Sequence, residues 1–150
     1  MQWEWPVMSK VMIDTNVWVD VILNRPDFVE ASKGAIMTCL EEGDDSLIAA
    51  TSLKDVFYFA AKSAGTDAGY RAVELVLDIA ELAQVDAAIC REALTLERPD
   101  YEDGIVAACV SAERADAIVT RDADSFKTLG VPKYTPSEFA AAKGYESIAL

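Results

Sequence analysis

Short apolar runs alternate along this chain with segments of helical periodicity, and this alternation constrains the fold more than any other feature. The runs VMI (11–13), LIAA (47–50) and AIVT (117–120) have the length and composition of buried strands, and helical patterns separate them. Buried strands that alternate with helices predict a parallel sheet with right-handed crossovers and helices on both faces. We therefore expect an α/β fold with three α/β/α layers and a central parallel sheet of four to five short strands.

Capping and helix-breaking residues predict the remaining elements. Weaker strands are expected near 83–85 and 133–134. The capping box TPSE (135–138) predicts a last helix that ends near Lys143. The other helices are expected over 16–23, 28–42, 53–64, 68–82, 86–97 and 101–113.

The length of the chain indicates one domain. A chain of 150 residues can bury one core of ordinary size but is too short for two comfortable domains, so we expect a single domain over residues 1–150. Residues 1–9 are interpreted as an N-terminal extension and residues 144–150 as a C-terminal tail. Trp3 and Trp5 leave open whether the extension packs on the domain surface.

Composition excludes several classes of function. The chain has no histidine, which removes Ser/His/Asp and Cys/His catalysis and the usual zinc sites. Its three cysteines lack CxxC spacing and are expected to be structural thiols in a reducing cytoplasm; the absence of a secretory signal and of a membrane-length apolar run agrees with that location. A net charge of −13 excludes a broadly basic nucleic-acid surface, but permits a locally basic rim and a basic partner segment.

Four aspartates are expected at one edge of the sheet. Asp14 ends the first strand and Asp122 follows the strand AIVT, while Asp55 and Asp103 lie in the first turns of crossover helices. Crossover helices run antiparallel to the strands, so their N-termini begin at the carboxyl edge, where ligands bind in such sheets. All four carboxylates can therefore converge.

Helix capping offers an alternative explanation for each aspartate taken alone. Asp14 can cap the helix after it, Asp124 can cap the short helix through Phe126, and Ser52 with Asp55 has the spacing of a cap and a first-turn acid. Capping does not require four acidic junctions at one edge, however. Crowded carboxylates resist ionisation unless a cation is present, and an all-oxygen set suits Mg²⁺ or Mn²⁺.

Four segments, in this order and spacing, resemble the PIN domain family of metal-dependent ribonucleases, which includes many bacterial toxins of toxin–antitoxin pairs. They are IDTNVWVD, SLKDVFYF, DYEDGIVAA and IVTRDADSF, and the resemblance runs from about Val11 to Ser137. It implies that the acidic positions of the family are Asp14, Asp55 (where many members have Glu), Asp103 and Asp122, with Asp124 an alternate ligand and Asn16 and Thr120 supporting polar residues.

The resemblance also implies a reaction and partners. The expected activity is Mg²⁺- or Mn²⁺-dependent hydrolysis of RNA phosphodiester bonds, in which a bound ion activates water and orients the phosphate. The expected partners are RNA and an antitoxin protein, and a homodimer is left open. Arg121, between Thr120 and Asp122, is a candidate for contacting a phosphate, with Lys54 a weaker one; ordinary solvated surface charge is the alternative for both.

Two rival functions remain at this stage. A phosphatase with Asp14 as nucleophile would usually carry a second aspartate two residues later, but that position is Asn16. A catalytically silent PIN-like interaction domain would keep the fold and the caps without the chemistry.

Overall fold

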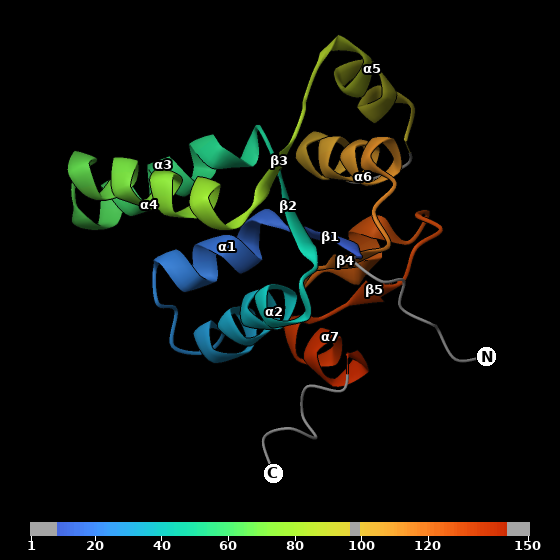
Figure 1. The fold of residues 1–150 in the computed structure, drawn as a ribbon. Coiled ribbons are helices and arrows are strands. Elements are labelled where there is room, and N and C mark those ends of the chain that lie inside the picture. The colour runs from blue at the N-terminus through green and yellow to red at the C-terminus, as the bar shows by residue number, and fades with distance from the viewer. Residues whose placement is uncertain (1–8, 97–99, 144–150) are drawn as a thin grey trace.

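The computed structural model describes residues 9–96 and 100–143, and Figure 1 shows how their helices and strands are arranged. The strands are β1 (Lys10–Ile13), β2 (Asp45–Ala49), β3 (Glu81–Ala83), β4 (Ala117–Val119) and β5 (Lys133–Tyr134). The helices are α1 (Thr15–Ile22), α2 (Val29–Glu42), α3 (Ser52–Ala64), α4 (Thr66–Ile79), α5 (Ala87–Thr95), α6 (Tyr101–Glu113), the 3₁₀ helix η1 (Ala123–Phe126) and α7 (Pro136–Ala142).

The five strands form one parallel sheet in the order β3-β2-β1-β4-β5, which confirms the predicted architecture. The first strand lies at the centre, where Met12 pairs with Leu47 on one side and with Ile118 on the other. The amide of Asp14 continues this pairing past the end of β1 by donating to the carbonyl of Val119 at 2.9 Å. The chain therefore leaves the sheet with Asp14 fixed at its carboxyl edge.

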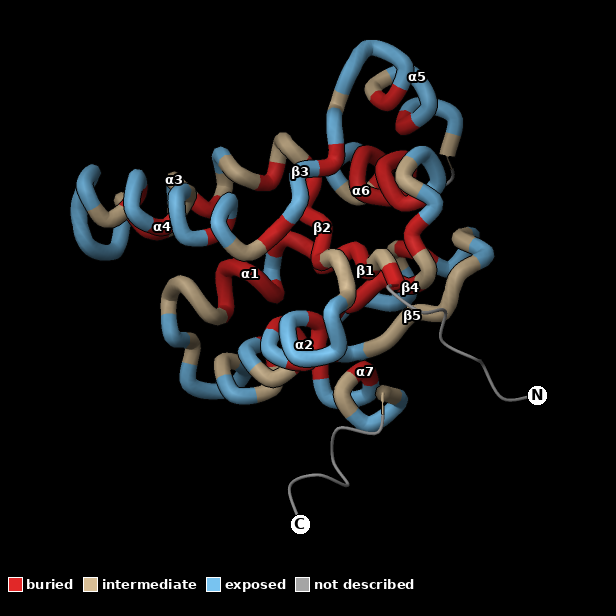
Figure 2. The backbone as a smooth tube through the Cα atoms, in the orientation of Figure 1, coloured by how far each residue is buried: buried red, intermediate tan, exposed pale blue. Residues whose placement is uncertain are grey.

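Alternate residues of the strands point into two separate cores. Val11 and Ile13 face the core built with α1, α2, α3, α4 and α7, whereas Met12 faces the core built with α5, α6 and η1. Figure 2 shows the buried backbone concentrated in β1, β2 and β4 and in the helix faces toward them. The continuous burial of these central strands on both faces is why they read as uninterrupted apolar runs.

The helices α3 and α4 form a hairpin that projects away from the sheet (Figure 1). Gly65 joins them at φ 96°, a conformation that side chains with a Cβ rarely adopt. At Gly69 the two helices approach so closely that a Cβ atom would lie 2.8 Å from the Phe57 ring. The hairpin therefore depends on glycine at two positions.

One predicted boundary is wrong. The helix expected to continue to residue 82 ends at Ile79, and β3 begins at Glu81 rather than at 83. Ala80 is already extended, with φ −105° and ψ 155°. Exposed leucines on this segment, such as Leu77 and Leu82, obscured the change of period at the sequence level. The helix expected to reach residue 97 ends at Thr95, before the residues that lie outside the described part.

The capping box of the last helix is confirmed. The Thr135 hydroxyl accepts from the amide of Glu138 at 3.1 Å, and the Glu138 carboxylate accepts from the amide of Thr135 at 2.8 Å. Pro136 occupies the first turn, as expected. The C-terminal tail and residues 1–8 of the expected extension lie outside the described residues, while Ser9 is buried and hydrogen-bonded to Asp44 and so belongs to the domain.

The three cysteines, Cys39, Cys90 and Cys109, are free. Burial raises the pKa of Cys39 to about 12 and that of Cys109 to about 11, as expected of structural thiols.

Within residues 9–96 and 100–143, every helix is too short or too polar to cross a bilayer.

Candidate metal-binding active site

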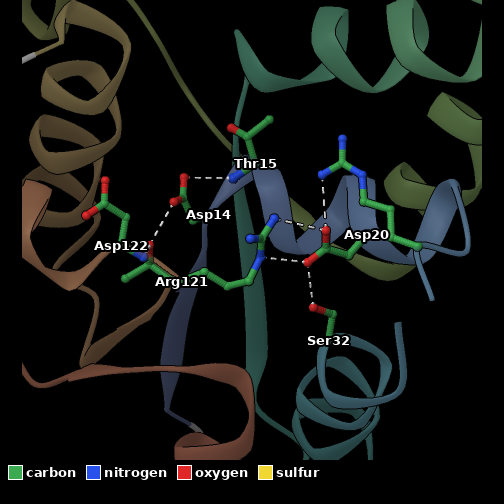
Figure 3. Close-up of polar contacts among 8 residues, drawn as sticks. Asp14, Thr15, Asp20, Ser32, Arg121 and Asp122 are labelled. Atoms are coloured by element: carbon green, nitrogen blue, oxygen red, sulfur yellow. Dashed lines mark hydrogen bonds and ion pairs between the residues drawn. The ribbon is translucent and has the colours of Figure 1, made fainter. Parts of the chain in front are cut away.

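Asp14 is held by two hydrogen bonds at the junction between β1 and α1. Its Oδ1 accepts from the amide of Thr15 at 2.8 Å, and its Oδ2 accepts from the hydroxyl of Thr120 at 2.8 Å. Asp14 is buried, with only 7% of its surface exposed to solvent. Asp14 therefore occupies the N-cap position of α1, but one of its oxygens is bound by the residue that follows β4 and not by the helix (Figure 3).

The four aspartates expected to converge line one cleft of about 350 Å³ at the carboxyl edge of the sheet. Asp14 comes from the end of β1, Asp55 from the first turn of α3, Asp103 from the first turn of α6, and Asp122 from the loop after β4. The other lining residues are Thr15, Asn16, Phe59, Asp100 and Glu102. The folding rules for a parallel sheet thus bring the predicted carboxylates together, although their chemical roles remain predictions.

Burial and mutual repulsion raise the pKa values of three carboxyl groups in this cleft. Burial raises the pKa of Asp103 to about 6, and the charges of Asp14, Asp100 and Asp122 act in the same direction. Burial also raises the pKa of Glu102 to about 7, with the neighbouring Asp55 adding to the shift. The pKa of Asp14 is raised by burial, against the hydrogen bonds from Thr120 and Thr15 that lower it.

The raised pKa values of these carboxyl groups favour a cleft that takes up a cation. Carboxylates that share a site resist ionisation because like charges repel, and a divalent ion removes that penalty. The donor set consists of oxygens alone, which fits Mg²⁺ or Mn²⁺. Among residues 9–96 and 100–143, however, no three ligating side chains are already gathered around one point. The chemistry fits a hard cation, while the side chains do not form a finished coordination sphere.

The first turns of α6 and α3 are capped differently. Asp100 caps α6, since its Oδ1 accepts from the amides of Glu102 and Asp103 at 2.7 and 3.2 Å. At the start of α3, Thr51 occupies the cap position without a side-chain capping bond. The Ser52 hydroxyl instead pairs with that of Thr15 at 2.6 Å, so the expected Ser52–Asp55 capping pair is wrong.

The loop after β4 separates Asp122 from Asp124. Asp122 occupies the cap position of η1, and its Oδ2 accepts from the Ser125 hydroxyl at 2.6 Å. Asp124 lies inside η1, so the prediction that Asp124 caps this helix is wrong. Asp124 is also absent from the lining of the cleft. Its expected role as an alternate ligand therefore gains no support from position.

The two supporting polar residues differ in their surroundings. Asn16 is exposed and lines the cleft. Thr120 is fully buried; its hydroxyl donates to Asp14 and accepts from the amide of Asp122 at 3.0 Å. Thr120 thus joins the first and last aspartates of the cleft through one oxygen.

Arg121 has a different partner from the one expected. Its Nε and Nη2 donate to the two carboxylate oxygens of Asp20 at 3.0 and 3.1 Å, and its guanidinium lies 3.8 Å from the centre of the Phe28 ring. Figure 3 shows the side chain reaching to Asp20 on α1. Arg121 is exposed, as the solvated-charge interpretation expects, but it is paired with Asp20, and a phosphate contact by Arg121 remains a prediction. The Nζ atom of Lys54, the weaker candidate, lies 3.3 Å from Asp55 Oδ1.

The family model described as "PIN domain" matches residues 10–124. The chain belongs to the PIN domain family. This match includes all four predicted acidic positions of the PIN domain and its first four strands. No match was found among curated proteins.

Solved structures share the fold of this PIN domain at low sequence identity. VapBC2 from Rickettsia felis, bound to a DNA fragment from its promoter, has 17% identity and a TM-score of 0.64, with 84% of this chain and 98% of that chain covered. VapC20 from Mycobacterium tuberculosis, described as a sarcin–ricin loop cleaving toxin, has 13% identity and a TM-score of 0.65, with 81% and 95% covered. DNA-bound VapBC from Salmonella typhimurium has 21% identity and a TM-score of 0.63, with 86% and 99% covered.

The lining residues of the cleft that were not predicted from sequence are Thr15, Phe59, Asp100 and Glu102, and Ser125 beside Asp122 was not predicted either. Glu102 lines the cleft beside Asp55, and Ser125 contacts Asp122. The segment DYED was a usable signal for Glu102, because an acid next to Asp103 in the first turn of α6 begins at the same edge. No sequence signal marks Ser125, since its position depends on the 3₁₀ turn of η1.

Proposed function

We propose that this PIN domain is an endoribonuclease that depends on Mg²⁺ or Mn²⁺ and acts as the toxin of a toxin–antitoxin pair. The observation that carries the proposal is the cleft in which Asp14, Asp55, Asp103 and Asp122 meet at the carboxyl edge of the sheet. Membership of the PIN domain family supports the reaction class. The raised pKa of Asp103 supports a site that gains a cation, because the carboxyl groups repel one another without one.

Each residue of the cleft has a proposed task. Asp14, Asp55, Asp103 and Asp122 would hold the ion, which when bound supplies Lewis-acid activation of water and of the scissile phosphate. The Thr120 hydroxyl binds one oxygen of Asp14 and would thereby hold the orientation of this carboxylate in the cleft. Asn16, at the exposed margin, would orient a water or a phosphate oxygen.

An antitoxin partner is proposed from the solved structures of similar fold. A structure of similar fold from Klebsiella pneumoniae is described as a toxin–antitoxin complex, and VapBC from Salmonella typhimurium and FitAB are described as bound to DNA. The net charge of −13 suits a partner with a basic segment. The cytoplasm, where RNA and such a partner would be met, is the proposed location.

A silent interaction domain is the competing proposal, and RNA cleavage separates the two. The purified chain is incubated with single-stranded RNA in Mg²⁺, with and without a chelator. Cleavage that disappears on chelation and in Asp103→Asn supports the nuclease. Asp78→Asn, on the exposed face of α4, is the matched control and should cleave like the parent. An inactive parent that still binds the ion would favour the silent domain.

A further inference from the structure

A buried carboxylate outside the cleft binds four polar groups. Asp20 on α1 is fully buried, and its oxygens accept from Arg121 Nε and Nη2, from Arg25 Nη1 at 3.1 Å and from the Ser32 hydroxyl at 3.0 Å (Figure 3). A buried ionised carboxylate is costly unless it is paired and hydrogen-bonded, and here both oxygens have two donors each. Such a complete set of contacts holds the donors in fixed positions.

Arg121 is the donor that leads back to the active site. Its guanidinium is fixed by the fork of two hydrogen bonds to Asp20 and by Phe28 beneath it. Its neighbours in the chain are Thr120, which donates to Asp14, and Asp122, which lines the cleft. Helix α1 is therefore joined to the end of β4 at two places, at its start through Asp14 and six residues later through Asp20.

We propose that Asp20 is a positioning residue, which anchors Arg121 and thereby sets where Thr120 and Asp122 lie relative to Asp14. The inference rests on the proposed nuclease function for its catalytic consequence. Its structural content does not, because the contacts of Asp20 and Arg121 are made within the chain itself. Arg121 acts here through the backbone of its neighbours, and not by meeting RNA.

Arg25 offers a matched control within the same network. Arg25 and Arg121 donate to the same carboxylate, and their side chains are 30% and 29% exposed. Each also lies over an aromatic ring, Arg25 over Phe59 and Arg121 over Phe28. Arg25 follows α1, and the residues before and after it in the chain do not line the cleft; its one printed contact with the lining is the Phe59 ring. A purely structural role for the network predicts similar effects of Arg25→Gln and Arg121→Gln.

The test compares these two variants by two measurements. The first is hydrogen exchange at the Asp122 amide of the metal-free protein, because that amide donates to Thr120. The second is the kinetics of RNA cleavage in saturating Mn²⁺. Arg121→Gln should speed exchange at Asp122 and lower kcat by about 10- to 100-fold, the range typical of lost support for a metal site, with KM nearly unchanged. Arg25→Gln should leave both measurements near the parent values.

Two results would overturn the proposal that Asp20 positions the active site through Arg121. Equal exchange and equal kcat in the two variants would overturn the proposal. A raised KM in Arg121→Gln with unchanged kcat and exchange would also overturn it, since that result describes direct binding of RNA. Should the parent cleave no RNA, the nuclease proposal fails while the exchange comparison still tests the anchor. If Arg121→Gln does not fold, Arg121→Lys, which keeps the charge but loses the planar fork, replaces it.

Discussion

The hydroxyl of Thr120 donates to Asp14 Oδ2 at 2.8 Å and so joins two residues that lie 106 positions apart in the sequence. The same hydroxyl accepts from the amide of Asp122. One buried oxygen thereby fixes the orientation of one acidic side chain and the backbone of another. This contact links the residues that follow β1 and β4 at the carboxyl edge of the sheet, beside the backbone pairing of the two strands.

The substitution Asp14→Asn separates capping from metal binding. Asparagine caps helices about as well as aspartate, and it removes a buried charge from a crowded cleft. One of the two donors to Asp14 would then face the amide nitrogen, at a cost of about 1 kcal/mol. We expect the metal-free free energy of unfolding to stay within about that amount of the parent value, while metal affinity and cleavage are lost. Urea unfolding paired with a cleavage assay measures both. A variant that still cleaves RNA fully would mean that Asp14 is only a cap.

The stability of the metal-free protein should fall as the pH rises from about 4 to about 7. The pKa values of Asp103 and Glu102 are about 6 and about 7 in the fold, above their ordinary values of 3.8 and 4.5. The folded chain therefore binds more protons than the unfolded chain in this window, and deprotonation favours unfolding. Urea unfolding at a series of pH values checks the direction. Saturating Mg²⁺ should reverse the trend, because the ion competes with protons for the same carboxylates.

Glu102→Gln should remove the upper part of that pH dependence. The residue contributes the group that titrates near pH 7, through burial and the neighbouring Asp55. Without it, the loss of stability should end near pH 6, where Asp103 titrates. Glu92→Gln, on the exposed surface of α5, is the control and should leave the profile unchanged. An unaltered profile in Glu102→Gln would contradict the assignment of this titration.

Asp122 and Asp124 should differ although only one residue separates them. Asp122 lines the cleft and Asp124 does not. We therefore expect Asp122→Asn to weaken Mn²⁺ binding and cleavage about 10- to 100-fold, the range seen when support for a metal site is lost, and Asp124→Asn to change neither appreciably. Calorimetric titration of the two variants side by side measures the difference. Equal losses in both would restore Asp124 as a ligand.

The sheet was predictable from sequence because its signals are local. The three central strands β1, β2 and β4 are short apolar runs, and the parallel direction of the strands then places Asp14 and Asp122 at one edge without further information. Asp55 and Asp103 follow by the same reasoning, since crossover helices begin at that edge. The boundary between α4 and β3 was not predictable, because the exposed apolar residues of that segment fit both periods.

The side-chain contacts were beyond the reach of sequence reasoning. Serine often caps helices, and Ser52 lies at the start of one. Its hydroxyl nevertheless forms a hydrogen bond with the hydroxyl of Thr15 on α1. Arg121 is exposed, as its polar loop suggests, but its ion pair with Asp20 was not predictable, because Asp20 is a charged residue on a helix with many apolar neighbours. Contacts of this kind depend on how elements distant in sequence are packed, which periodicity does not encode.

Calorimetric titration of Mn²⁺ into the metal-free protein, with its melting curve followed in parallel, tests the central claim most directly. The carboxylate cleft should bind the ion with release of protons, since Asp103 and Glu102 are partly protonated at neutral pH. The melting temperature should rise, because a ligand that binds only the folded state stabilises it. No heat of binding, together with an unchanged melting curve in millimolar Mn²⁺, would contradict the account.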